Sequence, residues 1–279
     1  NGPASVREKG RQIRKGADRE LKLKDGLILR EVAGQYVIVP TGKRVREVTD
    51  IVYISSSAAY LWDYMKDHEF EKEDLVRRIL EHYTGVTEEK AAADIDAFLK
   101  RLSDSNILDD GIVRGRVFRA DAGGKAPMNT ENSGQDFEPA CRRMEWLDPF
   151  YKEVWEKAFA DAIPISGTFE LTPRCNFNCR MCYVHLRPEQ IPKLGREMSA
   201  ADWIRTAEEA KEAGTAWLCV TGGEPLVHPE FRTIWRELTQ MGFFITLQTN
   251  ASLIDDDMAE FLEQYPPRAA KVTLLRLQR

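Results

Sequence analysis

The sequence predicts an α/β protein in two parts: a small α+β domain, then an incomplete barrel of alternating strands and helices. Three strand patterns and then three helix patterns occupy residues 21–110. From Thr168 onward strand and helix patterns alternate, which is typical of a parallel sheet with right-handed crossovers. A Gly-, Ser-, Asn- and Pro-containing stretch without periodicity, residues 120–138, is predicted to be the linker between them.

Composition sets limits on the protein class. The 279 residues are 43% hydrophobic, a content that suits globular cores, and they carry a net charge of −5. No apolar run approaches the ~18–20 residues of a membrane span, and residues 1–20 form a basic, charged tail without the apolar core of a secretory signal. Five cysteines, three of them in one cluster, favour a reducing compartment, so we expect a cytoplasmic protein.

The first domain is predicted to span residues 21–119. Strands are expected at 27–32, 35–39 and 50–54, and helices at about 55–65, 72–83 and from 88 onward. Ala33 and Gly34 signal a hairpin between the first two strands. Ser55 to Ser57 offer an N-cap, and the third helix follows Thr87 with two acids in its first turn. The apolar stripe of that helix has helical spacing: Ile95, Phe98, Leu99 and Leu102.

The second domain is predicted to span residues 139–279. Strands are expected at 168–172, 216–221 and 243–248, with a fourth beginning at 271–275, and helices at 149–161, 199–214, 228–242 and 255–265. Ser199 and Asp202 form a helix-start signal, whereas Gly214 and Gly242 are typical of positions just after a helix.

Three cysteines follow the first of these strands as Cys175, Cys179 and Cys182, in a C-x3-C-x2-C pattern. A [4Fe–4S] cluster held only by protein takes four thiolates, so three would leave one iron open to another ligand. Two alternatives remain at this point. A Cys3His zinc site could use His185, and buried free thiols could simply pack as small apolar groups. We expect Cys141 and Cys219 to be structural or incidental.

Two further motifs end the next two strands. Gly222, Gly223, Glu224 and Pro225 close the second strand; the glycines permit close approach to a ligand, and the proline fixes the exit from the turn. Alone, this motif is more often an ordinary strand-to-loop turn. Asn250 lies in Thr-Asn-Ala at the end of the third strand. All three motifs fall at strand ends, which is where β/α barrels place their active sites.

In this order the three motifs resemble those of radical S-adenosylmethionine (SAM) enzymes. The resemblance implies that Cys175, Cys179 and Cys182 hold a [4Fe–4S] cluster whose open iron binds SAM, and that SAM cleavage yields a 5′-deoxyadenosyl radical. It further implies an electron donor such as ferredoxin or flavodoxin. It places SAM against the two other motifs: Gly222, Gly223, Glu224, Pro225 and Asn250. In a version with a complete barrel, Gly223→Val should then lose SAM cleavage and keep its iron.

Some positions depart from the family pattern. Met181 is often aromatic in the family, and Ala251 stands where the family usually has glycine. Family barrels typically have six β/α units, whereas this chain stops in the fourth. We therefore expect a C-terminally truncated part of a longer enzyme, whose own activity the motifs leave open.

Residues 29–40 and 54–62 resemble the PqqD-like peptide-recognition domain, a small winged-helix-like fold. The resemblance implies that a leader peptide adds as a strand beside the strand at 50–54 and packs on the helix at 88–103. DNA binding, the other use of a winged helix, is disfavoured because residues 21–110 carry 13 Lys and Arg against 18 Asp and Glu.

The leading functional hypothesis is therefore a maturase that modifies a ribosomally synthesised precursor peptide. We expect residues 21–110 to bind the leader without the barrel, with side-chain contacts drawn from Tyr53, Ile54, Asp94 and Arg101. One alternative is a catalytically incomplete module that only binds leaders. Another is a radical SAM enzyme of a different substrate class, such as sulfatase maturation or cofactor biosynthesis, which the PqqD-like resemblance disfavours. Thioether formation, carbon–carbon bonding and epimerisation all remain open.

Overall fold

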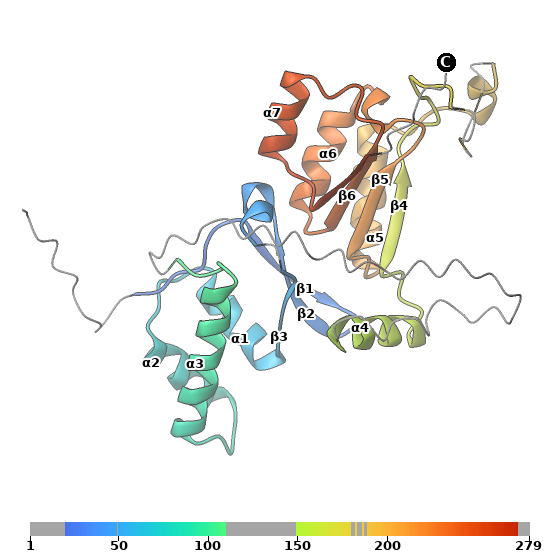
Figure 1. The fold of residues 1–279 in the computed structure, drawn as a ribbon. Coiled ribbons are helices and arrows are strands. Elements are labelled where there is room, and N and C mark those ends of the chain that lie inside the picture. Colours follow the sequence, from blue (N-terminus) through green and yellow to red (C-terminus); the bar gives the residue numbers. More distant parts are fainter. Residues whose placement is uncertain are drawn as a thin grey trace, which may run out of the picture.

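The computed structural model describes residues 20–48, 50–109, 149–179, 182, 186 and 189–272. It confirms the predicted α/β class, with a three-stranded antiparallel sheet and a four-stranded parallel sheet (Figure 1). The expected linker, Cys141 and nearly all of the basic tail lie outside the described residues. No helix in the described part of the chain is long and apolar enough to cross a bilayer.

The first domain follows the predicted order of elements. Its elements are β1 (Leu27–Val32), β2 (Gln35–Pro40), β3 (Val52–Ile54), α1 (Ser56–Met65), α2 (Lys72–His82) and α3 (Glu88–Asp104). Ala33 and Gly34 both have positive φ, 49° and 74°, as a two-residue type I′ hairpin requires. The hydroxyls of Ser55 and Thr87 accept backbone N–H bonds at the starts of α1 and α3, which confirms the predicted cap at Ser55 and the predicted start of α3 after Thr87.

The sheet β1–β2–β3 is buried on both faces. Because side chains alternate along a strand, Ile38, Val52 and Ile54 face α1, α2 and α3 in one core. Val37 and Val39 point the opposite way, into a second core that includes residues of α4 (Pro149–Ala160) and of the parallel sheet. Figure 1 shows the β1–β2 hairpin between the helices of the first domain and the lower end of β4 to β6. Burial on both sides accounts for the unbroken apolar run in β2.

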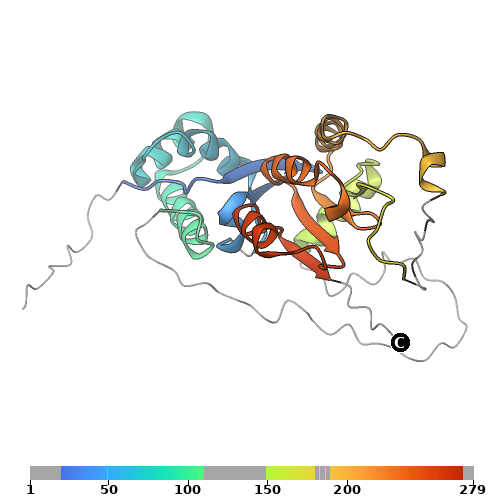
Figure 2. The ribbon, with the colours of Figure 1, turned by 90° about the horizontal axis from the view of Figure 1, so that it is seen from above.

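The second domain alternates strands and helices as predicted. Its elements are β4 (Ser166–Glu170), α5 (Ala200–Glu212), β5 (Trp217–Thr221), α6 (Phe231–Gln240), β6 (Phe244–Thr249), α7 (Asp256–Gln264) and β7 (Ala269–Val272). The strands pair in parallel in the order β4–β5–β6–β7, and one apolar core joins one face of the sheet to α5, α6 and α7 (Figure 2). Among the described residues, the opposite face carries the partly exposed side chain of Cys219 and the exposed side chain of Gln248.

Several boundaries differ from the sequence-based expectations. The first parallel strand spans 166–170 instead of 168–172, and the last begins at Ala269, with 273–275 outside the described residues. Helix α6 begins at Phe231, not at His228. The ring of His228 is the reason: it lies 3.1 Å from the Met198 carbonyl and accepts from Glu230 N–H, which holds this stretch as a loop.

Candidate functional site

The three predicted motifs meet at the carboxyl end of the parallel sheet. The cysteine loop, which carries Cys175, Cys179 and Cys182, follows β4. The glycine motif, residues 222–225, follows β5, and Asn250 follows β6. Because these strands are adjacent and parallel, their carboxyl ends share one edge of the sheet (Figure 1). The structure therefore brings together the residues that the sequence predicted as one site.

The cysteine loop presents free thiols. Cys175 is exposed, and Cys179 and Cys182 are partly exposed. Burial raises the pKa of Cys179, and repulsion from the sulfurs of Cys175 and Cys182 raises this pKa further. A cationic metal group here would reverse that repulsion and favour thiolates.

The alternative of a Cys3His zinc site needs four ligands close together. In the stretches of chain that the structure describes, no three His, Cys, Asp or Glu side chains gather closely enough to hold a single metal ion. His185, the fourth ligand of a Cys3His site, lies outside the described residues.

The glycine motif packs directly on the cysteine loop. The amide of Gly223 donates to the Thr172 carbonyl at 2.7 Å, and that of Glu224 donates to the Arg174 carbonyl at 2.9 Å. A Cβ on Gly222, where φ is +145°, would lie 2.6 Å from the Thr172 oxygen. A Cβ on Gly223 would lie 2.7 Å from the Arg174 carbonyl carbon. Close packing of two backbones therefore requires these glycines, a reason that the sequence alone did not reveal.

Glu224 joins the second motif to the third. Its side chain is only 1% exposed. The carboxylate accepts from the Thr249 hydroxyl and the Asn250 amide, both at 2.7 Å, and from the Leu226 amide at 3.2 Å. Both oxygens are thus occupied by protein donors, so Glu224 positions the end of β6.

Asn250 in turn contacts the cysteine loop. Its Nδ2 donates to Asn176 Oδ1 at 2.9 Å and lies 3.9 Å from Cys175 Sγ. Asn176 Nδ2 donates a hydrogen bond to Ser252 Oγ at 2.7 Å, and sequence reasoning missed both residues. Their only sequence signal is their place beside predicted site residues. Ala251 has φ +61°, a conformation that favours glycine, which fits the glycine usual in the family at this position.

Arg174 and Glu197 brace the start of the cysteine loop. The guanidinium of Arg174 binds both carboxylate oxygens of Glu197, at 3.0 and 2.7 Å, and the Thr172 hydroxyl also donates to this carboxylate. Burial alone would raise the pKa of Glu197, but these bonds outweigh burial and lower it. A cavity of about 350 Å³ lies beside this pair, at the free side of β4, and Trp203 forms part of its lining.

The residues predicted to contact a peptide lie on β3 and α3, and one of them is corrected by the structure. Arg101 of α3 stacks over the ring of Tyr53 of β3, 4.3 Å from its centroid, and Asp94 is exposed on the same helix. The prediction that the Ile54 side chain contacts a peptide is wrong, because this side chain is 5% exposed and packs into the core beneath the helices.

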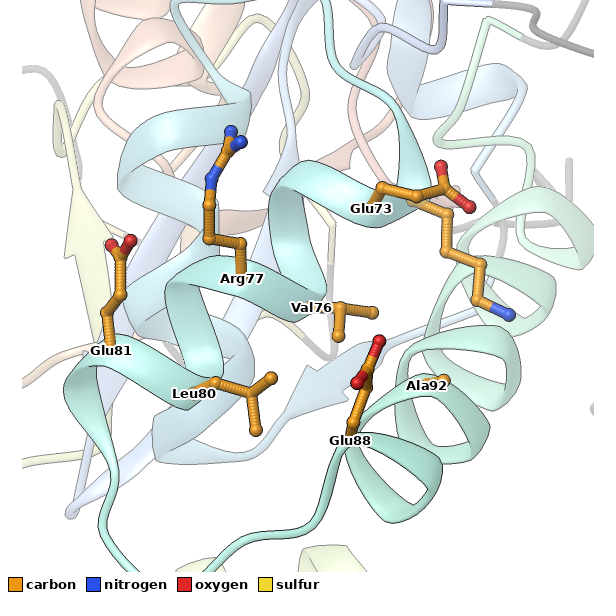
Figure 3. Close-up of a pocket in the computed structure, with 8 residues that line it drawn as sticks. Glu73, Val76, Arg77, Leu80, Glu81, Glu88 and Ala92 are labelled. Atoms are coloured by element: carbon orange, nitrogen blue, oxygen red, sulfur yellow. The ribbon is translucent and has the colours of Figure 1, made fainter.

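A separate hollow lies on the other side of α3. It has a volume of about 450 Å³ and is lined by residues of α2 and α3 that include Arg77, Leu80, Glu81 and Glu88 (Figure 3). Its lining mixes both charges with a few apolar groups. It is distinct from the predicted groove, which lies on the β3 side of α3.

Comparisons with known proteins agree with both halves of the chain. Residues 169–275 match the model of the radical SAM superfamily, and residues 35–108 match that of coenzyme PQQ synthesis protein D (PqqD). The chain is similar to the antilisterial bacteriocin subtilosin biosynthesis protein AlbA of Bacillus subtilis, with 31% identity over 37% of this chain and 22% of that protein. It is also similar to the PqqA peptide cyclase of Granulibacter bethesdensis, with 28% identity over 36% of this chain and 26% of the cyclase.

Two solved structures of Streptococcus suis SuiB align with most of the chain. SuiB bound to S-adenosylmethionine aligns over 92% of this chain and 49% of its own, with 14% identity and a TM-score of 0.43. SuiB bound to precursor peptide SuiA gives 13% identity, the same shares of both chains and a TM-score of 0.44. The chain thus spans about half of SuiB, and its matched segment covers about a quarter of the two curated relatives.

Proposed function

We propose that this chain is the leader-binding and cluster-binding part of an enzyme that modifies a ribosomally synthesised precursor peptide. The chain joins a region that matches the radical SAM superfamily to one that matches PqqD. Cys175, Cys179 and Cys182 would hold a [4Fe–4S] cluster. SAM would lie against the residues of the other two motifs: Gly222, Gly223, Glu224, Pro225 and Asn250. The observation that carries the proposal is the hydrogen-bonded convergence of all three motifs at one sheet edge.

The residues present suit these cofactors. The donor set is three free thiols of one short loop, which an iron–sulfur cluster takes as thiolates. When bound and reduced, such a cluster supplies the electron that cleaves SAM to methionine and a 5′-deoxyadenosyl radical. Glu224 holds Thr249 and Asn250 in place, and Asn250 braces the loop at Cys175 through Asn176.

The partners follow from the same assignment. Cys175 is exposed, so a small electron carrier such as ferredoxin or flavodoxin could approach the cluster. Free thiols also suit a reducing compartment, which supports a cytoplasmic enzyme. The PqqD match, together with a relative named as a peptide cyclase, supports a peptide substrate.

The direct test is anaerobic reconstitution of the chain with iron and sulfide, followed by SAM and dithionite. We expect brown protein, SAM binding measured by calorimetry, and release of 5′-deoxyadenosine detected by chromatography. SAM binding without release would favour the leader-binding alternative for this chain. Failure of the chain to bind either iron or SAM would refute the proposed site.

We predict that Glu224→Gln weakens SAM binding without removing the cluster. The NH₂ group of the new amide would face either the Thr249 hydroxyl or the Asn250 backbone N–H, both of which now donate to the carboxylate. The donor left without an acceptor costs about 1–3 kcal/mol. Calorimetric titration with SAM and iron analysis measure the two effects. Glu230→Gln is the control, because Glu230 contacts the start of α5 at Ala200. Unchanged SAM affinity in Glu224→Gln would contradict the positioning role.

We predict that a leader peptide binds the outer edge of β3. In the sheet order β1–β2–β3, the outer edge of β3 has no partner strand among the described residues, so an added strand can use its backbone groups. The probe is a synthetic leader from a precursor gene adjacent to the gene of this chain. Amide exchange in the full chain should slow in β3 and α3 on titration. Binding of duplex DNA at the same surface would contradict this use of the domain.

A further inference from the structure

Arg30 extends from the PqqD domain into the radical SAM domain. It lies on β1, is only 6% exposed, and donates to three backbone carbonyls of the other domain. Its Nη1 lies 2.8 Å from the Thr215 oxygen and 3.1 Å from the Gly242 oxygen, and its Nη2 lies 3.1 Å from the Lys211 oxygen. The guanidinium also lies 5.5 Å from the centre of the Phe243 ring.

The three acceptors stand where helices give way to strands. Lys211 is in the last turn of α5, Thr215 lies between α5 and β5, and Gly242 lies between α6 and β6. The final carbonyls of a helix lack intrahelical partners and carry the negative end of the helix dipole. One arginine of the PqqD domain therefore bonds to carbonyls at or just beyond the carboxyl ends of two helices of the radical SAM domain.

Burial makes this arrangement depend on contact between the domains. Burial lowers the pKa of Arg30, although arginine stays protonated in proteins. A buried guanidinium without acceptors would carry a large desolvation cost. The bonds to Thr215, Gly242 and Lys211 offset that cost only while the two domains are docked.

An apolar core surrounds the arginine. Val32, Val37 and Val39 of the PqqD sheet share one buried cluster with residues of α4 and of the parallel sheet: Val154, Ala158, Ile165, Ala216 and Phe244. At its rim, Gln35 bonds Glu153 at 3.0 Å, and Arg46 pairs with Glu263 at 2.8 Å. A buried apolar centre with a polar rim is the usual anatomy of a specific interface.

We infer that the β1–β2 face of the PqqD domain is a fixed docking surface for the amino-terminal ends of the radical SAM strands, with Arg30 as its anchor. The two domains then form one rigid unit, which replaces the expectation of a recognition domain that works independently on a flexible linker. The contacts fall at the starts of three strands, since Ile165 and Ala216 precede β4 and β5, and Phe244 begins β6.

This placement limits the substrate, a consequence that rests on the proposed function. The interface lies at one end of the parallel strands and the cysteine loop lies at the other. A precursor held by the PqqD domain must therefore span at least the length of β5. Five residues at about 3.3 Å each make about 17 Å, so a spacer of roughly five or more extended residues must separate leader segment and modified residue.

The test compares the whole chain with Arg30→Met and Arg30→Lys by scanning calorimetry and small-angle X-ray scattering. The original chain should melt in one transition and scatter as one compact particle. Arg30→Met should lower the first transition by about 5–10 °C, split the melting curve, and enlarge the particle. Lysine keeps the charge without the planar fork, so Arg30→Lys should fall between them.

Arg77→Met is the matched control, because the Arg77 side chain is 65% exposed on α2 and, within the described part of the chain, forms its ion pair with Asp74 of the same helix. It should behave as the original chain. Two separate transitions and an extended particle in the original chain would overturn the inference, even if Arg30→Met failed to fold. None of these measurements needs iron, SAM or peptide, so their outcome is independent of the proposed function.

Discussion

Replacing Cys175, Cys179 or Cys182 with alanine is expected to abolish iron–sulfur binding. A cube held by three thiolates loses a third of its protein ligands with each replacement, and two thiolates do not retain a [4Fe–4S] cluster. The reconstituted chain should contain about four irons and four sulfides, whereas each variant should contain close to none. Iron and sulfide analysis, together with electron paramagnetic resonance of the reduced protein, measures the loss.

Cys219→Ala is the control for those three variants. Cys219 is a partly buried thiol within β5 and lies outside the loop that carries the other three cysteines. This variant should bind iron as the original chain does. Stoichiometric zinc in place of iron after full reconstitution, or iron retained in all three loop variants, would contradict the cluster assignment.

Local chemistry explains why much of this fold could be predicted. The caps at Ser55, Thr87 and Ser199 depend on one side chain and the next turn of backbone, so they are legible in sequence. The capping box of Ser199 and Asp202 is present as expected. The shared position of the three motifs follows from strand alternation, which orders the strand ends along one sheet edge.

Contacts between distant segments explain what could not be predicted. An arginine in a strand, such as Arg30, ordinarily indicates an exposed face, and only the docked partner makes it buried. Glu224 resembles a ligand contact in sequence, yet its acceptors are filled by Thr249 and Asn250, 25 and 26 residues away. The need for glycine at 223 likewise comes from the backbone of the loop after β4.

Gly223→Ala is expected to disturb both the cluster and the SAM site. The sequence alone predicted that Gly223→Val would lose only SAM cleavage and keep its iron. The structure indicates otherwise, because even one methyl group at this position would lie 2.7 Å from the Arg174 carbonyl carbon and 2.8 Å from the Pro173 oxygen. The loop that carries Cys175 must then shift, which breaks the bonds that the Gly223 and Glu224 amides donate to it. Overpacking of this kind costs about 1–3 kcal/mol.

The matched control for this variant is Gly167→Ala on β4, where a new Cβ would meet its nearest atoms at 3.7 and 3.8 Å, an ordinary van der Waals distance. Gly223→Ala should melt several degrees below Gly167→Ala and bind less iron after the same reconstitution, and valine, being larger, should do worse. Thermal melts and iron analysis of the variants measure both effects. Gly223→Ala could instead keep its iron and melt at the same temperature as Gly167→Ala while losing SAM affinity. That result would mean that glycine is needed at 223 for the close approach of a ligand and not for packing against the cysteine loop.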